Sequence, residues 1–350
     1  MNRLRLVCLF MGGAALAQAA WFKGNTHTHT INSDGNATPD VVARWYREHG
    51  YQFVVITDHE YLTDVAPLNA LFARDGQFLV IAGQEVSQHL GKSRDPRDPT
   101  NRPACHVNAI NSRRIVVPLG GTAGKAFGFA PPDMTMAETY ARNLAEIRAA
   151  GGIAQVNHPN WKWSVRPEDL LGLPDGTLLE IWNGHPAINN LGGIDDDGNI
   201  APSAVALWDS LLSKGRRIWG AATDDSHYFY HLDENPGPKP GQAWVVVRAD
   251  QLSAESITTA LAKGDFYSST GVVIDEITST GGAVSLQLNG QPRGPRFLTR
   301  FIGREGRVLA EVPGLHPRYD IKGDEGYVRA HVTDSSGLQA WTQPVFVAGR

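Results

Sequence analysis

Cysteine, long apolar runs and excess positive charge are all scarce in this chain. Only Cys8 and Cys105 occur among its 350 residues. Cys8 falls in a predicted signal peptide, so the mature protein would keep Cys105 alone, which excludes an intramolecular disulfide. No apolar run approaches the roughly 20 residues that a membrane-spanning helix needs, so we expect no membrane span. The formal net charge of −4 disfavours a nucleic-acid partner, because such binding relies on clustered lysine and arginine.

The first 19 residues have the pattern of a secretory signal peptide. Arg3 and Arg5 precede an apolar stretch over residues 6–16, and Ala17-Gln18-Ala19 follows as a cleavage site of small residues. We expect residues 1–19 to be removed and the product to be periplasmic or secreted. Loss of the two arginines would take the formal net charge from −4 to −6.

Residue types that bind metal ions stand at or near the ends of several apolar runs. His27 and His29 are two positions apart, so on a strand their side chains project from the same face. Because the carboxyl ends of the strands in an α/β barrel meet at one face, residues that follow separate runs would come together there. We predict nine metal ligands, which are His27, His29, Asp34, His59, Glu85, His106, His158, Asp224 and His227.

Helical stretches alternate with these runs and predict an α/β fold. Thr38-Pro39 supplies a capping residue and a first-turn proline for a helix over residues 40–49. Thr135-x-x-Glu138 is a capping box for a helix over residues 135–150. From about residue 271, short alternating strands with glycine-rich turns replace this pattern. We therefore predict a barrel over residues 20–270 and a β-rich domain over residues 271–350.

Two long irregular stretches interrupt the barrel pattern, at residues 88–104 and 118–133. Loops of that length inside a compact domain are commonly lids, substrate walls or disordered segments. We expect the first to form a substrate wall, because it directly follows Glu85.

Imidazole and carboxylate ligands without a set of thiolates suit Zn²⁺, Mn²⁺ or Fe²⁺. Six histidines and three acids are more than one ion can use, so we predict two or three divalent metal ions. Such a site lowers the pKa of a bridging water into the neutral range, and the resulting hydroxide can attack an electrophile. The composition of the cluster therefore predicts a metallohydrolase.

The order of the local motifs, HTHT, SDG, TDH, GQE, CHVN, NHP and DDSH, resembles that of the PHP (polymerase and histidinol phosphatase) family of metal-dependent phosphoesterases. Within that family the chain looks most similar to secreted CehA/McbA-like members. The resemblance implies a distorted (β/α)7 barrel, here with a small C-terminal all-β appendage. It also implies an allocation of ligands: His27, His29, Glu85 and Asp224 to one ion, Glu85, His106 and His158 to a second, and Asp34, His59 and His227 to a third.

Other polar residues beside the predicted ligands are candidates for catalysis or substrate binding. Asp58 and Asp225 stand next to ligands and could orient imidazoles or move a proton. Glu180, Asn183 and His185 lie at the end of the run 177–182, where the barrel pattern predicts another strand end. The predicted catalytic residues are Asp58, Asp225 and His185. The predicted substrate-binding residues are Asn157, Asn160, Lys162, Asn183 and Arg113.

Three functions compete at this stage. The first is hydrolysis of a small phosphoester, either a monoester or a diester, which the family resemblance favours. The second is hydrolysis of a carboxylic ester, carbamate or amide, which the CehA/McbA-like resemblance implies. A phosphatase pocket should carry cationic side chains beyond the metals, whereas an aryl ester or carbamate pocket should be apolar and aromatic. The third is a non-catalytic secreted binding protein, in which the β-rich domain would carry the function.

Overall fold

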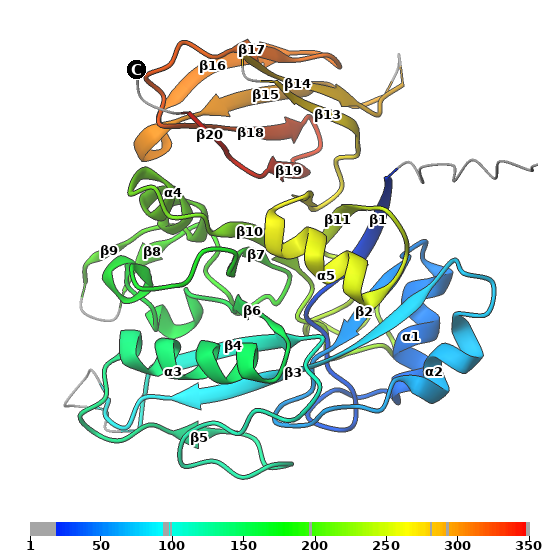
Figure 1. Ribbon diagram of the computed structural model, residues 1–350, viewed down its shortest axis with the longest axis vertical. Coiled ribbons are helices and arrows are strands. Elements are labelled where there is room, and N and C mark those ends of the chain that lie inside the picture. Colours follow the sequence, from blue (N-terminus) through cyan, green and yellow to red (C-terminus); the bar gives the residue numbers. More distant parts are fainter. Residues whose placement is uncertain are drawn as a thin grey trace, which may run out of the picture.

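The computed structural model describes residues 19–93, 98, 100–195, 198–280, 282–291 and 294–347. Residues 1–18, which make up most of the predicted signal peptide, lie outside these ranges. Strands and helices alternate over most of the chain, and a group of strands without long helices follows at its C-terminal end (Figure 1). Within the described ranges, no helix has both the length and the apolar character needed to cross a membrane.

The α/β part contains twelve strands, five α-helices and two 3-10 turns among the described residues. Its strands are β1 (Ala20–Asn25), β2 (Phe53–Ile56), β3 (Leu79–His89), β4 (Ala104–Ile110), β5 (Gly128–Phe129), β6 (Ile153–Val156), β7 (Leu178–Asn183), β8 (Gly193–Ile194), β9 (Ile200–Ala201), β10 (Trp219–Thr223), β11 (Trp244–Ala249) and β12 (Phe266–Ser269). Its helices are α1 (Pro39–Glu48), α2 (Ala66–Phe72), α3 (Met136–Ala149), α4 (Ala204–Ser213) and α5 (Ala254–Lys263), and the 3-10 turns are η1 (Trp161–Trp163) and η2 (Pro167–Leu170).

One large sheet runs through the α/β part in the order β10-β7-β6-β4-β3-β2-β1-β11-β12. The pairs β1/β2, β2/β3, β6/β7 and β7/β10 are parallel, whereas β4 runs antiparallel to both β3 and β6. The side chain of Ser268 on β12 joins this end of the sheet to β10, because it accepts a hydrogen bond from Ala222 N and donates one to Gly220 O. The fold is thus mixed α/β with a parallel-rich sheet, and its regular alternation is interrupted at β4.

The two helix starts predicted from capping patterns lie at the expected positions. At α3, Glu138 N donates to Thr135 Oγ1 over 3.2 Å and Thr135 N donates to Glu138 Oε2 over 2.8 Å, which completes the capping box. Helix α1 begins at Pro39, and the chain leaves it through Gly50 with φ +75°. This left-handed backbone favours glycine.

Apolar faces of the helices cover the sheet and hold its strands in place. Val42 and Tyr46 of α1 pack with Val54 and Ile56 of β2. On the other side of the fold, Ile147 of α3 belongs to a core that also includes strands β4, β6 and β7. Burial of each such aliphatic side chain contributes about 1.5–3 kcal/mol to folding. The carboxyl ends of the strands stay free of these helices and carry the polar residues.

The C-terminal part of the described chain is made of strands. They are β13 (Ile274–Thr280), β14 (Ala283–Leu288), β15 (Phe297–Ile302), β16 (Val308–Pro313), β17 (Arg318–Asp320), β18 (Tyr327–Asp334), β19 (Gln339–Thr342) and β20 (Val345–Phe346), with the 3-10 turn η3 (Arg304–Gly306). Sheet β13-β14-β17 faces the end of the large sheet, β19-β18-β15-β16, and Phe301 stacks on Tyr319 between them at 5.5 Å.

A buried ion pair joins this C-terminal part to α4. Asp209 of α4 accepts hydrogen bonds from Arg329 Nε and Nη2 at 2.8 and 2.7 Å and from the Tyr327 hydroxyl at 2.7 Å. Arg329 is 2% exposed and Asp209 is 6% exposed. The guanidinium also lies 4.9 Å from the centre of the Trp208 ring. The two parts of the chain are therefore held together by a specific polar contact as well as by strand pairing between β12 and β19.

Candidate metal centre

Eight of the nine predicted ligands converge at the carboxyl ends of the strands. β1 leads to His27 and His29, β2 to His59, and β6 to His158. Glu85 and His106 lie on the antiparallel strands β3 and β4, where Glu85 pairs with Asn108 and His106 with Ser87. They are offset by two positions, so both side chains project from the same face of the sheet. The residues whose donor atoms gather there are His27, His29, Asp34, His59, Glu85, His106, His158, Asp225 and His227, and we call them the donor cluster.

The first donor group combines two imidazoles and two carboxylates. Asp225 Oδ1 lies 3.2 Å from His27 Nε2 and 3.3 Å from His29 Nε2. Glu85 Oε2 lies 3.4 and 3.5 Å from the same two nitrogens, which are 3.2 Å apart. Donors about 2.0–2.2 Å from a tetrahedral Zn²⁺ are about 3.3–3.6 Å from one another. The separations and the chemistry of His27, His29 and Glu85 fit a divalent ion of this kind, and Asp225 lies beside both imidazoles.

Glu85 also belongs to a second donor group through its other oxygen. Its Oε1 atom lies 3.1 Å from His106 Nδ1 and 3.2 Å from His158 Nε2. Asn157 Nδ2 donates to the same oxygen over 2.8 Å, which fixes the carboxylate between the two groups. The structure thus gathers the residues that the resemblance allocated to a second ion, with Glu85 shared between both.

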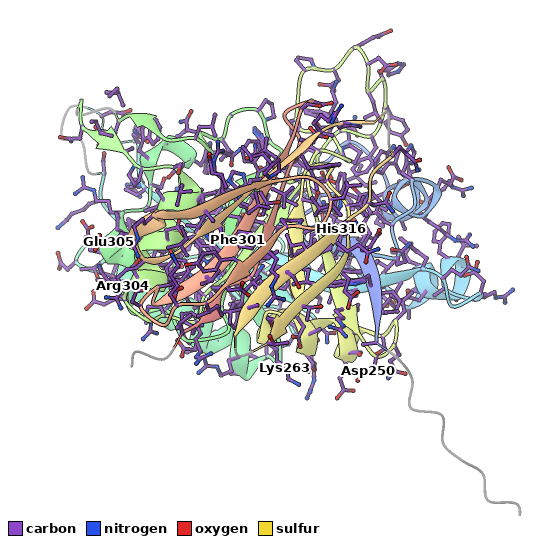
Figure 2. All side chains as sticks on the ribbon, turned by 90° about the horizontal axis from the view of Figure 1, so that it is seen from above. Asp250, Lys263, Phe301, Arg304, Glu305 and His316 are labelled. Atoms are coloured by element: carbon purple, nitrogen blue, oxygen red, sulfur yellow. The ribbon has the colours of Figure 1, made fainter. Side chains whose placement is uncertain are left out.

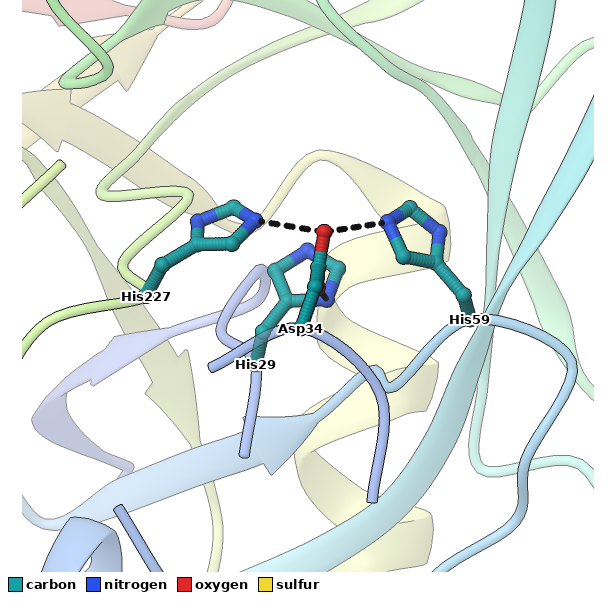
Figure 3. A group of neighbouring side chains, drawn as sticks. All are labelled: His29, Asp34, His59 and His227. Carbon is teal, nitrogen blue, oxygen red and sulfur yellow. Dashed lines mark ion pairs between the residues drawn. The ribbon is translucent and has the colours of Figure 1, made fainter. Parts of the chain in front are cut away.

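A third donor group surrounds Asp34 (Figure 3). Asp34 Oδ2 lies 3.2 Å from His59 Nε2 and 3.4 Å from His227 Nε2. Asp34 Oδ1 lies 3.4 Å from His29 Nδ1. His29 therefore faces the first group with one ring nitrogen and the third group with the other. Asp34 is half exposed, whereas His29 and His59 are buried, so the third group lies at the open side of the donor cluster.

The predicted ligand Asp224 does not join the donor cluster, and Asp225 occupies its place. Asp224 is buried on the opposite side of the chain, where its carboxylate accepts hydrogen bonds from Gln242 N, Ala243 N and Gly241 N and from the Tyr46 hydroxyl. Asp225 has a left-handed backbone with φ +49°, a conformation that aspartate tolerates better than most residues. The allocation of Asp224 to the first ion is corrected accordingly.

Two amide substitutions should separate the roles of these neighbours. Asp225→Asn should lower metal retention, and it should also lower the free energy of unfolding of the metal-free protein, because the ionised carboxylate is stabilised by the imidazoles of His27 and His29. Asp224→Asn should lower that free energy by about 1–3 kcal/mol, since an amide nitrogen then faces backbone N–H donors. Metal content after dialysis and urea unfolding of the metal-free variants would measure the two effects. Equal metal loss in both variants would contradict the reassignment.

Burial and mutual charge set the protonation of the donor cluster. Burial lowers the pKa of His106 to about 3, and burial together with His227 lowers the pKa of His29 to about 4. Burial opposes ionisation of Glu85, but the imidazoles around it outweigh this and hold its pKa well below the usual range. The pKa of Asp225 is held low in the same way, chiefly by His27 against the effect of burial. Against the effect of burial, the neighbouring carboxylates raise the pKa of His27, His158 and His227, and they raise that of His59 to about 9. Ionised acids and neutral imidazoles are the forms that bind metal cations, so these four histidines would release protons when an ion binds.

Glu180 supports the donor cluster without contacting its open side. Its carboxylate accepts a hydrogen bond from His158 N and lies 2.7 Å from His27 Nδ1. It also accepts a hydrogen bond from the Thr223 hydroxyl. A carboxylate on the far nitrogen of an imidazole orients the ring and keeps its other nitrogen available for a metal. Its place at the end of the apolar run 177–182 is the only signal that the sequence carries for this role.

Asp58 and Asn183, predicted for catalysis and substrate binding, are buried supports. Asp58 accepts hydrogen bonds from Thr30 N, Thr30 Oγ1, Ser33 Oγ and Thr63 Oγ1, and so holds the loop between His29 and Asp34. Asn183 donates to Glu180 and Asp225 and accepts from His185 N. Neither residue lines the pocket above the donor cluster, so we correct both assignments.

The remaining predicted substrate-binding residues also lie off this pocket. Asn157 holds Glu85, and Asn160 donates to Asn189 O and Pro202 O. Lys162 lines a neighbouring cavity of about 400 Å³, with its ammonium 5.3 Å from the centre of the Trp161 ring. Arg113 N donates to Ala150 O, before the start of β6 and at the opposite end of that strand from His158. The side chains of Asn157 and Asn160 thus stabilise the surroundings of the pocket, and the substrate-binding roles of Lys162 and Arg113 stay predictions.

A pocket of about 270 Å³ opens above the donor cluster. Its walls beyond the cluster are Phe127, Trp161, Ile188 and His185. Phe127 comes from the second of the two long loops, and its N–H donates to Glu60 Oε2, which anchors that loop over the site. From the sequence we expected the first loop to be the wall, and we missed both Phe127 and Glu60. No lysine or arginine is among the described residues that line this pocket.

No family model and no curated protein matches this chain. Three solved structures are similar to it in part. A two-domain protein from Bacteroides vulgatus ATCC 8482 that contains a predicted PHP-like metal-dependent phosphoesterase is 18% identical, with 93% of this chain and 96% of that chain covered and a TM-score of 0.48. A candidate metal-dependent phosphoesterase from Bifidobacterium adolescentis ATCC 15703 is 16% identical (62% and 90% covered, TM-score 0.37). An amidohydrolase from Chromobacterium violaceum with bound sulfate and no metal is 16% identical (59% and 87% covered, TM-score 0.33).

Proposed function

We propose that this protein is a metal-dependent hydrolase of small phosphoesters that have an apolar or aromatic leaving group. The observation that carries the proposal is that Glu85 and His29 each face two of the three donor groups. Two or three divalent ions held by these groups would lie within reach of one substrate. Ions held there supply an activated water and positive charge. We also propose that the family is the PHP family, with its distorted (β/α)7 barrel, and that the protein is exported to the periplasm or secreted.

The charge of the site supports a phosphoester over a neutral substrate. The donor cluster contains three carboxylates, Asp34, Glu85 and Asp225. Three divalent ions would outweigh them and leave net positive charge for a phosphoryl group without help from lysine or arginine. The protein's own contribution is to hold these donors in place through Glu180 and Asn157, and to exclude water through the walls of the pocket.

A carboxylic ester, carbamate or amide is the second candidate, and the pocket walls favour it. Phe127, Trp161 and Ile188 surround the donor cluster, and the described lining holds no cationic side chain. This is the pattern expected for a neutral aryl substrate. Among phosphoesters it favours aryl diesters, which carry one negative charge, over the more strongly anionic monoesters.

Turnover by the metal-stripped protein reloaded with Mn²⁺ or Zn²⁺ would test the proposal. The substrates are bis-p-nitrophenyl phosphate, p-nitrophenyl phosphate, p-nitrophenyl acetate and a 1-naphthyl carbamate, compared side by side. We expect metal-dependent release from the phosphates, with the diester preferred, and at least about a hundredfold loss in Asp225→Asn. Release from the acetate and carbamate alone would overturn the phosphoester proposal and establish the second candidate.

A further inference from the structure

His185 is the one pocket residue with an imidazole that lies outside the donor cluster. Twelve described residues line the pocket, and eight of them belong to the donor cluster. Phe127, Trp161 and Ile188 supply three more, with mainly apolar surfaces. His185 therefore carries a polar group that can contact substrate without being needed to hold a metal ion.

The backbone around His185 is fixed relative to the donor cluster. Asn183 Oδ1 accepts the His185 N–H over 2.8 Å, and Asn183 Nδ2 donates to Asp225 Oδ2 over 3.1 Å. Gly184 lies so close to the neighbouring chain that a Cβ atom there would be 2.7 Å from Gln242 Cβ. One amide side chain thus connects the position of His185 directly to that of the ligand Asp225.

The hydrogen bonding of the His185 ring selects one tautomer. Ala187 N donates to His185 Nδ1 over 3.0 Å, so the lone pair of this nitrogen is already used. A neutral imidazole whose Nδ1 accepts a hydrogen bond carries its proton on Nε2. The ring stands edge-on to the ligand His227, with the ring centres 5.9 Å apart and an interplanar angle of 86°. The free nitrogen of His185 is therefore a hydrogen-bond donor at the rim of the donor cluster.

We propose that His185 is a catalytic residue that donates its Nε2–H to the leaving-group oxygen of the substrate. The proposal rests on the proposed hydrolase function. The organic part of a substrate fits against the apolar walls, and Ile188 is supplied by the same loop as His185. An organic part that packs on Ile188 would bring the oxygen that joins it to the reacting centre next to His185.

The bond changes of hydrolysis leave the proton of His185 where it is. An oxygen of water bonds to the phosphorus, and the bond between phosphorus and the leaving oxygen breaks with its electron pair on that oxygen. The leaving oxygen takes its proton from the attacking water. His185 stabilises the developing charge by a hydrogen bond and does not act as the acid, because protonation of Nδ1 would break the bond from Ala187.

The tautomer can be tested without turnover. In Zn²⁺-loaded protein labelled with ¹⁵N-histidine, the His185 nitrogens should show the neutral Nε2–H form, and addition of phenol together with inorganic phosphate should shift the Nε2–H signal. His185→Leu identifies the signal by its loss. An Nδ1–H form, or an unchanged Nε2–H signal when calorimetry shows phenol bound in the presence of phosphate, would overturn the proposal.

The dependence of rate on the leaving group tests the catalytic role. Aryl phosphoesters with leaving groups of increasing pKa would be compared in the wild type, His185→Leu and His185→Gln. A donor to the leaving oxygen matters most for poor leaving groups, so His185→Leu should lose about 10²–10³-fold in kcat for these and little for p-nitrophenyl esters. Glutamine, which can place an N–H near the Nε2 position, should restore part of the loss.

His316→Leu provides a matched control, because His316 is an exposed histidine of the C-terminal part (Figure 2). It should leave every rate unchanged. A loss in His185→Leu that is equal for all leaving groups would overturn the proposal, as would wild-type rates. Absence of turnover in the wild type would instead contradict the proposed function, and the NMR experiment would still decide the role of His185.

Discussion

Replacing Glu85 by glutamine should remove metal-dependent turnover and lower the amount of metal that the protein retains. The Glu85 carboxylate is 1% exposed, and its two oxygens face different donor groups. A neutral amide would supply one oxygen where two anionic ones are needed. Loss of a residue that only hydrogen-bonds to a metal ligand lowers the affinity for the metal roughly 10–100-fold. Loss of a ligand that two donor groups share should therefore lower it further. Elemental analysis after dialysis, together with turnover, would measure the effect.

Glu138→Gln is a matched control for this substitution, because Glu138 is an exposed acid in the capping box of α3. It should change neither metal content nor turnover. Full metal content in Glu85→Gln would show that the donor groups act independently of this residue, and it would contradict the shared cluster.

Asp209→Ala should lower the free energy of unfolding by about 3–5 kcal/mol, because it leaves the buried guanidinium of Arg329 without a counter-charge. The Tyr327 hydroxyl would lose its acceptor as well. Because Asp209 lies outside the donor cluster, the folded variant should keep its metal. Urea unfolding of the metal-free protein would give the change in stability.

The exposed pair of Arg300 and Glu311 provides the comparison for Asp209. Its nitrogen and oxygen are also 2.7 Å apart, but both side chains are well exposed. Glu311→Ala should therefore cost less than about 1 kcal/mol. Replacing both buried partners, in Asp209→Leu/Arg329→Met, should recover much of the stability. A loss in Asp209→Ala no larger than that in Glu311→Ala would argue against a desolvated ion pair.

The residues whose proximity could be predicted from the sequence follow from local regularities. His27 and His29 share a face because strand side chains alternate, and His59 and His158 follow short buried runs that become neighbouring parts of one sheet. The start of α3 follows from the same kind of local evidence, since the capping box involves residues only three positions apart.

The predicted roles were wrong at positions where the regular alternation of strand side chains ends. The choice between Asp224 and Asp225 depends on a left-handed backbone just after β10, which no pattern in DDSH indicates. The supporting roles of Asn183 and Asp58 depend on hydrogen-bond partners that lie far away in the sequence. Asparagine and aspartate also occur as substrate-binding residues, so the residue type alone does not distinguish the two roles. Phe127 was missed because the anchor of its loop, Glu60, is 67 positions away.

The position of His29 between two donor groups limits how they can be filled. A neutral imidazole has one lone pair, so His29 can coordinate through Nε2 or through Nδ1, but not through both unless the ring loses its remaining proton. If Nε2 serves the first group, the third keeps Asp34, His59 and His227. Three protein ligands are the number that catalytic zinc sites generally retain, with the fourth position left to solvent or substrate. The half-exposed Asp34 lies at this open side, so the ion nearest the solvent would be the exchangeable one, and occupancy at this position would rise and fall with the metal supply around the protein.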